Sequence, residues 1–227
     1  MAKLLTTRIS RRTFAQAATS MLALAALPTQ AAESSAETTR SAVHARLTRR
    51  DPLLIAEQGS FAAGGAVIEP TAAFDPLHPE SRAQSLHGDH AFVSYQMPAK
   101  LRGVPLVFLH GAGQFSKTWD TTPDGREGFR NLFLRLGHSV YLVDQPRRGG
   151  AGRSIERGEI PATPDDQFWF GQFRMGLWPN FYPGSAFAQD AASLDQFFRQ
   201  MTPNTAPYNA EVNAQALSAV MARVQAS

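Results

Sequence analysis

A short glycine-containing turn is the part of this sequence best suited to chemistry. The residues His110-Gly111-Ala112-Gly113 come directly after the apolar run Leu106–Leu109. Glycines on both sides of Ala112 let the backbone bend sharply and bring its N–H groups close to a ligand. Such donors stabilise the negative charge that develops on oxygen during acyl transfer, and one donor lowers the barrier by about 2.7–4 kcal/mol. A tight turn without any catalytic role has the same pattern.

The elements on either side predict where this turn lies. Residues 106–109 and 140–143 are unbroken apolar runs, which are typical of strands buried on both faces of a parallel sheet. Between them, apolar side chains recur at helical spacing over residues 129–136. A strand, a helix and a strand in this order predict a βαβ unit with parallel strands. Functional groups gather beyond the carboxyl ends of such strands, so the turn is well placed for a site.

Capping residues predict where the helices begin and end. Asp124 is expected to cap the helix over 129–136, with Glu127 three residues later, and Gly137 is expected to end it. Asn209 is expected to cap a final helix over 212–224. The other expected elements are strands over 61–68 and 91–97, an aromatic-rich stretch over 165–178 and an amphipathic helix over 187–201.

Further motifs surround the turn. Trp119 begins the pattern W-x-T-T-P-D-G-R, and Val143-Asp144-Gln145 ends the second apolar run. Together with the His-Gly pair, these motifs resemble the α/β-hydrolase family, most closely a branch of bacterial secreted esterases. The resemblance covers roughly residues 60–227 and is strongest over 105–154. A Gly-rich loop that ends this stretch resembles the family's G-x-G-x-S turn, with looser spacing.

The resemblance implies roles for the residues of the turn. The Ala112 backbone N–H would be an oxyanion-hole donor, with Gly111 and Gly113 shaping the turn around it. His110 would anchor the loop and would not be the catalytic histidine. Asp144 would stabilise the loop that follows its strand.

Aromatic residues offer a further expectation. Trp119 and the aromatic segment 168–178 could line a pocket for the acyl or alcohol part of a substrate. For any one of these side chains, plain core packing is the competing interpretation.

The sequence departs from the family where the nucleophile should lie. Family members carry a serine on a G-x-S-x-G-like elbow, followed by an acid and a histidine. Ser154 and Ser185 lack the flanking glycines of such an elbow, and no histidine follows His138. The predicted class is therefore α/β: a partial α/β-hydrolase fold over 51–227 with a mostly parallel sheet flanked by helices, truncated before the nucleophile strand. Residues 155–205 are expected to form a cap or a pocket-lining insertion.

Other sites are weaker candidates. Ser116, His138 and Asp144 could form a triad, but His138 begins a buried strand at the wrong end of the sheet. The segment His87–His90 carries two imidazoles and a carboxylate, a pattern more typical of a solvated loop than of a metal site. The Gly-rich segment 149–152 lacks the Lys-Ser/Thr of a phosphate-binding loop. We expect no metal and no cofactor.

The leading hypothesis is a carboxylic-ester hydrolase that acts through Ser–His–acid acyl transfer in its full-length form. The expected partner is a small-molecule ester, and this chain would supply the oxyanion loop without the triad. The 227-residue chain is therefore predicted to be inactive alone. An alternative is a non-catalytic, truncated binding module or pseudoenzyme of the same fold. The fold also serves dehalogenases, epoxide hydrolases and lyases.

Charge and cysteine content exclude some classes of protein. The formal net charge is +3, but residues 1–31 hold four basic and no acidic side chains. Removing these four from the 22 basic residues leaves 18 against 19 acidic ones, a net charge of −1. No basic stripe for nucleic acid remains. Cysteine is absent, which excludes disulfides and a Cys nucleophile within the chain.

The N-terminus is typical of an export signal. Residues Ser10–Phe14 read S-R-R-T-F, the core of a twin-arginine signal, and an Ala- and Leu-rich segment follows over 17–27. An ordinary secretory signal with two arginines is the alternative. Either signal predicts an exported protein, periplasmic or secreted, with residues 1–31 removed. Residues 32–50 would form a linker, and no stable membrane anchoring is expected after removal of the signal.

Overall fold

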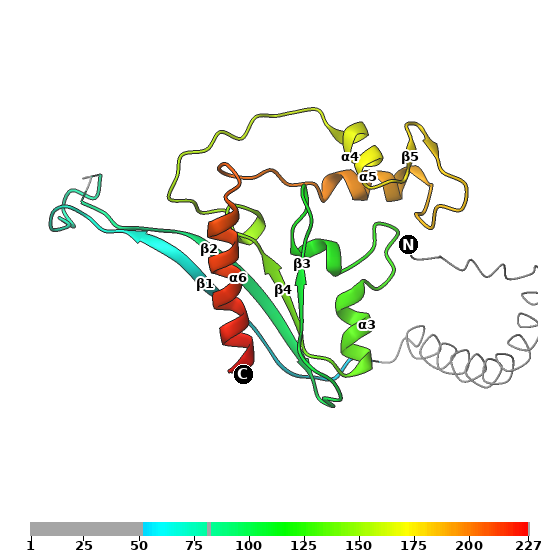
Figure 1. The fold of residues 1–227 in the computed structure, drawn as a ribbon, viewed down its shortest axis with the longest axis horizontal. Coiled ribbons are helices and arrows are strands. Elements are labelled where there is room, and N and C mark those ends of the chain that lie inside the picture. The colour runs from blue at the N-terminus through cyan, green and yellow to red at the C-terminus, as the bar shows by residue number, and fades with distance from the viewer. Residues whose placement is uncertain (1–51, 81–82, 227) are drawn as a thin grey trace, which may run out of the picture. The chain divides into compact units, whose positions relative to one another are not determined.

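The computed structural model describes residues 52–80 and 83–226. These residues belong to the unit Asp51–Ser227, and the predicted signal peptide (1–31) and linker (32–50) lie outside them. The elements follow the chain in the order β1 (Ile55–Ile68), β2 (Leu86–Pro98), β3 (Leu106–Leu109), η1 (Ser116–Trp119), α3 (Phe129–Leu136), β4 (Val140–Asp144), η2 (Gly149–Ala151), α4 (Asp166–Gln172), β5 (Gly176–Leu177), β6 (Asn180–Phe181), α5 (Ala191–Arg199) and α6 (Ala210–Gln225) (Figure 1).

The main sheet has the strand order β1-β2-β4-β3. The pairs β1/β2 and β2/β4 are antiparallel, and β3/β4 is parallel with Leu106 opposite Val140. The α/β class is confirmed. Within the described strands, however, the sheet is mixed rather than mostly parallel, because α3 provides a helical crossover only between β3 and β4. The long β1/β2 hairpin supplies the antiparallel part.

Both faces of β4 are buried, which explains its continuous apolar sequence. Tyr141 and Val143 pack with Val220 of α6, whereas Val140 and Leu142 pack with Leu134 of α3. Successive side chains of a strand point to opposite faces, so α6 and α3 cover opposite sides of the sheet (Figure 1). The prediction from the apolar runs is confirmed for this strand. Its carboxyl end is thereby held between two helical layers.

The start of α3 differs from the prediction. Its N-cap is Gly128, and Asp124 lies outside the helix, where it accepts a hydrogen bond from Thr122 Oγ1 at 2.5 Å and pairs with Arg126 Nε at 2.7 Å. An antiparallel β-bridge between Thr121 and Glu127 holds residues 121–127 in a turn, so the helix begins only after this turn. Glu127 does not return to the cap; its carboxylate instead pairs with an arginine of α3.

The other helix boundaries largely follow the predictions. Gly137 ends α3 in the left-handed conformation, with φ 93°. The side chain of Asn209 caps α6, accepting hydrogen bonds from Glu211 N and Val212 N at 3.0 and 3.1 Å. The helix expected over 187–201 is the shorter α5, capped by Asp190. Among the described residues, no helix is long and apolar enough to cross a membrane.

A buried ion pair ties β2 to the loop after β4. Arg147 Nε and Nη2 donate to the two carboxylate oxygens of Asp89 at 2.9 and 2.7 Å, and both side chains are 2% exposed. Arg147 Nη1 also donates to the carbonyl oxygen of Pro207, just before α6. Asp89 and Arg147 have positive φ of 59° and 68°, a strained conformation for residues with a side chain. The pair therefore holds three distant segments together at some cost in backbone strain.

We predict that Asp89→Asn lowers the free energy of unfolding by about 3 kcal/mol, because it removes the buried charged partner of Arg147 and leaves the guanidinium only the half-exposed carboxylate of Glu156. The hydrogen bonds from Arg147 hold the pKa of Asp89 below its usual value. The stabilisation is therefore complete above about pH 4 and is lost as pH falls through the lowered pKa of the folded state. Urea unfolding over a pH series measures both effects.

The matched control is Asp195→Asn, which removes a carboxylate from an exposed pair with Arg199. This variant should change the unfolding free energy by less than about 1 kcal/mol. Equal effects of the two substitutions, or an unchanged pH dependence in Asp89→Asn, would contradict the role of the buried pair.

Candidate active site

The turn His110–Gly113 lies at the carboxyl edge of the parallel pair. It follows β3 directly, and Gln145 follows β4 at the same edge because the two strands are parallel. The Gln145 backbone N–H donates to His110 Nε2, and Gln145 Nε2 donates to the His110 carbonyl oxygen, both at 3.1 Å. The turn is therefore attached to the neighbouring loop through both the ring and the backbone of His110.

The ring of His110 has no nitrogen left for catalysis. Its Nδ1 donates to the Gly111 carbonyl oxygen at 3.0 Å, and its Nε2 accepts from Gln145. This arrangement requires a neutral ring with the proton on Nδ1. Burial lowers the pKa of His110, which further favours the neutral form. The geometry supports an anchoring role for this histidine.

The Gly111 carbonyl oxygen accepts hydrogen bonds from three donors. They are His110 Nδ1 at 3.0 Å, Arg148 Nη1 at 3.2 Å and the Gln114 backbone N–H at 3.3 Å. The peptide between Gly111 and Ala112 is trans, so its N–H points away from its C=O. Ala112 is exposed, and no group within residues 52–80 and 83–226 accepts a hydrogen bond from its N–H. The peptide thus presents a donor to the outside of the turn.

Only one of the two glycines occupies a position that requires glycine. Gly113 has φ 70°, and a Cβ there would lie 2.6 Å from the ring of Trp169. Its carbonyl oxygen also accepts a hydrogen bond from Thr202 N at 2.9 Å. At Gly111 the nearest atom to an added Cβ is Gln114 Oε1, at an ordinary 3.9 Å. Gly113 is therefore the point at which the segment 155–205 contacts the turn.

Asp144 joins two loops at the same edge. The carboxylate is 3% exposed and accepts hydrogen bonds from Ser116 N at 2.6 Å and Gly150 N at 2.7 Å. Ser116 begins η1, and Gly150 lies in η2. The side chain thus links the segment after the turn to the Gly-rich loop, in agreement with the expected role in stabilising that loop.

Trp119 lies on the α3 side of the sheet. Its ring packs against Phe108 and Phe129, with ring centroids 5.2 and 5.8 Å away. Its Nε1–H is buried, and no acceptor for it exists in the described part of the chain. The structure therefore brings Gly111, Ala112 and Gly113 to the sheet edge but places Trp119 in an aromatic cluster away from them. Its predicted contact with substrate stays a prediction.

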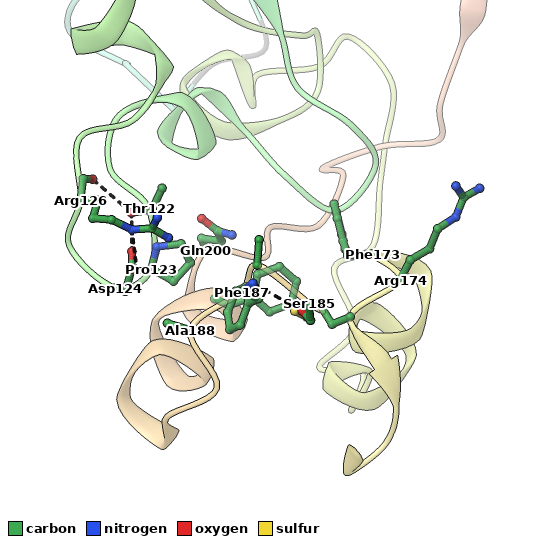
Figure 2. Close-up of a pocket in the computed structure, with 13 residues that line it drawn as sticks. Thr122, Pro123, Asp124, Arg126, Phe173, Arg174, Ser185, Phe187, Ala188 and Gln200 are labelled. Carbon is green, nitrogen blue, oxygen red and sulfur yellow. Dashed lines mark hydrogen bonds and ion pairs between the residues drawn. The ribbon is translucent and has the colours of Figure 1, made fainter. Parts of the chain in front are cut away.

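A cavity of about 410 Å³ lies between the turn over 122–126 and the segment that covers it (Figure 2). In Figure 2, Phe187 and Ser185 occupy the middle of the view, with Phe173 on the opposite side from Asp124. Phe173 also contacts Trp169, with ring centroids 5.9 Å apart, and Trp169 rests on Gly113. The rings of Phe173 and Trp169 therefore connect the cavity to Gly113 of the His110–Gly113 turn. The residues that line the cavity are Thr122, Pro123, Asp124, Arg126, Phe173, Arg174, Met175, Ser185, Ala186, Phe187, Ala188, Phe197 and Gln200.

Sequence reasoning did not single out Arg148 or Trp169 as residues that contact the turn. Arg148 donates to the Gly111 carbonyl oxygen, and Trp169 covers Gly113. Arg148 belonged to a Gly- and Arg-rich loop without a distinctive spacing, and Trp169 to a stretch with several aromatic residues. Neither pattern distinguishes the residue at the turn from its neighbours.

The other candidate sites are not assembled. His138 Nδ1 donates to the Val104 carbonyl oxygen near the amino ends of β3 and β4, whereas Ser116 and Asp144 meet at the carboxyl ends. Over the described ranges, no serine or threonine hydroxyl is hydrogen-bonded to a histidine ring. The carboxylate of Asp89 is bound to Arg147, and the residues with described positions contain no group of three His, Cys, Asp or Glu placed to hold a metal.

The chain is similar to two known proteins, one named as a lipase and one as an esterase. No protein-family model matches the chain. The chain is 35% identical over 133 residues to a protein named Probable secreted lipase phiG from Fungal sp. (strain ATCC 74256), a match that covers 53% of this chain and 35% of the fungal protein. It is also similar to the solved structure of a novel bacterial esterase, with a TM-score of 0.59 and 26% identity over 78% of this chain and 60% of the esterase.

The chain thus spans about a third of the fungal protein and 60% of the esterase. The sequence similarity to a secreted lipase and the structural similarity to an esterase establish an esterase-like α/β-hydrolase fold for the described residues.

We predict that alanine substitution affects the stability of the protein at Gly113 but not at Gly111. Gly113→Ala should destabilise the protein by at least about 1–2 kcal/mol, because alanine strains a positive φ and its Cβ meets the ring of Trp169. Gly111→Ala is the matched control and should change stability by less than about 0.5 kcal/mol. Urea unfolding followed by circular dichroism measures both. Equal losses would mean that Gly113 does not contact Trp169 in this way.

Proposed function

We propose that this chain supplies the oxyanion-stabilising loop of a carboxylic-ester hydrolase, which acts by Ser–His–acid acyl transfer in its full-length form. The observation that carries the proposal is the orientation of the Gly111–Ala112 peptide. Three donors bind its carbonyl oxygen, so the trans peptide directs the Ala112 N–H away from them at the carboxyl edge of β3. The fold and the esterase and lipase similarities support this assignment.

The chemistry follows from the position of that donor. When a serine attacks an ester carbonyl, the carbonyl oxygen gains negative charge as the tetrahedral intermediate forms. The Ala112 N–H would donate to this oxygen and stabilise it more than the uncharged oxygen of the ester. The donor is already oriented before substrate arrives, so no reorganisation is required at the moment of reaction. The resemblance to the esterase branch implies that a G-x-S-x-G-like elbow carries the serine.

We assign the apolar part of the ester to the cavity beside the turn. The segment 155–205 has a hydrophobic cluster of its own, built on Phe170, Met175 and Phe197, and it would act as a cap. The cavity of about 410 Å³ lies in the size range of small-molecule sites. Phenylalanine side chains on the cap side suit an acyl or alcohol chain, and Trp169 connects this region to Gly113.

Export of the protein is part of the proposal. The twin-arginine pattern at Ser10–Phe14 and the similarity to a lipase named as secreted both support it. The net charge of −1 outside residues 1–31 supports a small-molecule partner rather than nucleic acid. The substrate class proposed is therefore a small ester that the protein meets outside the cytoplasm.

The activity test begins with the DNA that follows the codon for Ser227. We expect one of its three reading frames to encode a strand followed by a G-x-S-x-G-like turn. The protein translated through that frame should hydrolyse p-nitrophenyl butyrate, and the 227-residue chain should show no turnover above background. Ala112→Pro in the longer protein removes the proposed donor and should lower kcat by about 10²–10³-fold.

Ala112→Ser keeps the N–H and is the matched control, with kcat expected near the unmodified value. No serine elbow in any frame, or activity in the 227-residue chain that depends on its own residues, would overturn the proposal. Equal activity of the proline and serine variants would remove Ala112 from the mechanism. The absence of a serine elbow in every frame, together with a stable, inactive monomer, would favour the non-catalytic module.

If the cavity binds the acyl chain of the ester, filling it should change the preferred length of that acyl chain. Ala188→Phe places a ring in the cavity and should lower kcat/KM for p-nitrophenyl octanoate by at least about tenfold, since two displaced methylene groups cost roughly 1.6 kcal/mol. The value for p-nitrophenyl acetate should stay nearly unchanged. Ala192→Phe, on an exposed position of α5, is the control and should affect both esters equally. Equal losses of kcat/KM for both esters in Ala188→Phe would mean that the acyl chain binds outside this cavity.

A further inference from the structure

We propose that Arg148 polarises the Gly111–Ala112 peptide, making the Ala112 N–H a stronger hydrogen-bond donor toward a negatively charged oxygen. Arg148 is thus a positioning residue, which acts on the reacting oxygen through a peptide group. This inference rests on the proposed function, because that function makes Ala112 the oxyanion donor. It adds that the charge of Arg148 makes the Ala112 N–H a stronger hydrogen-bond donor.

The guanidinium of Arg148 contacts two carbonyl oxygens at the turn. Its Nη1 donates to the Gly111 carbonyl oxygen at 3.2 Å and to the Gln114 carbonyl oxygen at 3.5 Å. On its other side, Nε donates to Asn204 Oδ1 at 2.7 Å, and Nη2 donates to the same oxygen. Asn204 follows the helical part of the cap and so holds the guanidinium against the turn.

The positive charge of Arg148 is not neutralised by a bound carboxylate. Across the described residues, no Asp or Glu forms an ion pair with it, and its hydrogen-bond acceptors are amide oxygens. The adjacent Arg147, in contrast, is paired with both Asp89 and Glu156. The nearby carboxylate of Asp144 accepts from the backbone N–H groups of Ser116 and Gly150.

The surroundings strengthen the effect of this charge. Arg148 is half-buried, and burial lowers its pKa, although an arginine stays protonated at neutral pH. A charge in a less polar environment acts more strongly on neighbouring dipoles than one in water. Burial lowers the pKa of His110; the charge of Arg148 acts in the same direction, whereas the hydrogen bond to Gly111 and the charge of Asp144 oppose it.

Peptide resonance connects the charge to the donor. A cation at the Gly111 carbonyl oxygen draws electron density from the attached nitrogen, so the Ala112 N–H carries more positive charge and is more acidic. Removal of that proton by hydroxide leaves an anion whose charge lies largely on the Gly111 oxygen, next to Arg148. The rate of base-catalysed hydrogen exchange at Ala112 therefore measures the proposed polarisation directly.

The experiment measures hydrogen exchange of the Ala112 amide by NMR in the 227-residue chain. In the unmodified protein, this amide should exchange with hydroxide faster than the same amide in a His-Gly-Ala-Gly peptide. Arg148→Gln should slow the exchange by about tenfold, which equals one pKa unit of amide acidity. Arg148→Lys retains the charge and should restore most of the rate. Arg199→Gln, which removes an exposed charge on α5, is the matched control and should leave the rate unchanged.

An unchanged Ala112 rate in a folded Arg148→Gln protein would overturn the inference. Should that variant fail to fold, the unmodified protein and Arg148→Lys decide: exchange no faster than in the peptide would overturn it equally. The measurement uses no ester. A negative result therefore leaves the proposed hydrolase activity intact, and a failure of the ester assay leaves the amide acidity unaffected.

Discussion

The parallel pairing of β3 with β4 is the constraint on which the arrangement of the site depends. Because both strands run in the same direction, the turn after β3 and the loop after β4 leave the sheet at one edge. This arrangement lets the ring of His110 accept from Gln145 and lets Arg148 reach the Gly111 carbonyl oxygen. The burial of β4 between α3 and α6 holds this edge in place.

The part of the fold that could be predicted from sequence is the part governed by local periodicity. The apolar run over 140–143 predicted a strand buried on both faces, and Tyr141 and Leu142 do lie on opposite faces. Asn209 predicted the start of α6 because an N-cap acts within one turn of the helix. Asp124 did not cap α3, since a bridge between Thr121 and Glu127 took precedence over the local signal.

The rest depends on contacts between residues that are distant in sequence. Asp89 and Arg147 are 58 positions apart, and nothing in either local pattern marks them as partners. Arg148 and Asn204 are 56 positions apart, so the contact that fixes the Arg148 guanidinium could be found only from the structure. The mixed sheet has the same origin, because the long antiparallel hairpin of β1 and β2 pairs with β4 through β2.

The contact between Trp169 and Gly113 also bears on how such a loop could be transplanted. The indole of Trp169 is oriented by its Nε1–H bond to Asp165, and it fills the space where any other residue at position 113 would place its Cβ. If the four-residue turn were grafted alone into another scaffold, Gly113 would lose its contact with the indole of Trp169. The transferable unit is therefore the turn together with the helical segment that rests on it, and exchange between relatives must move both as one piece.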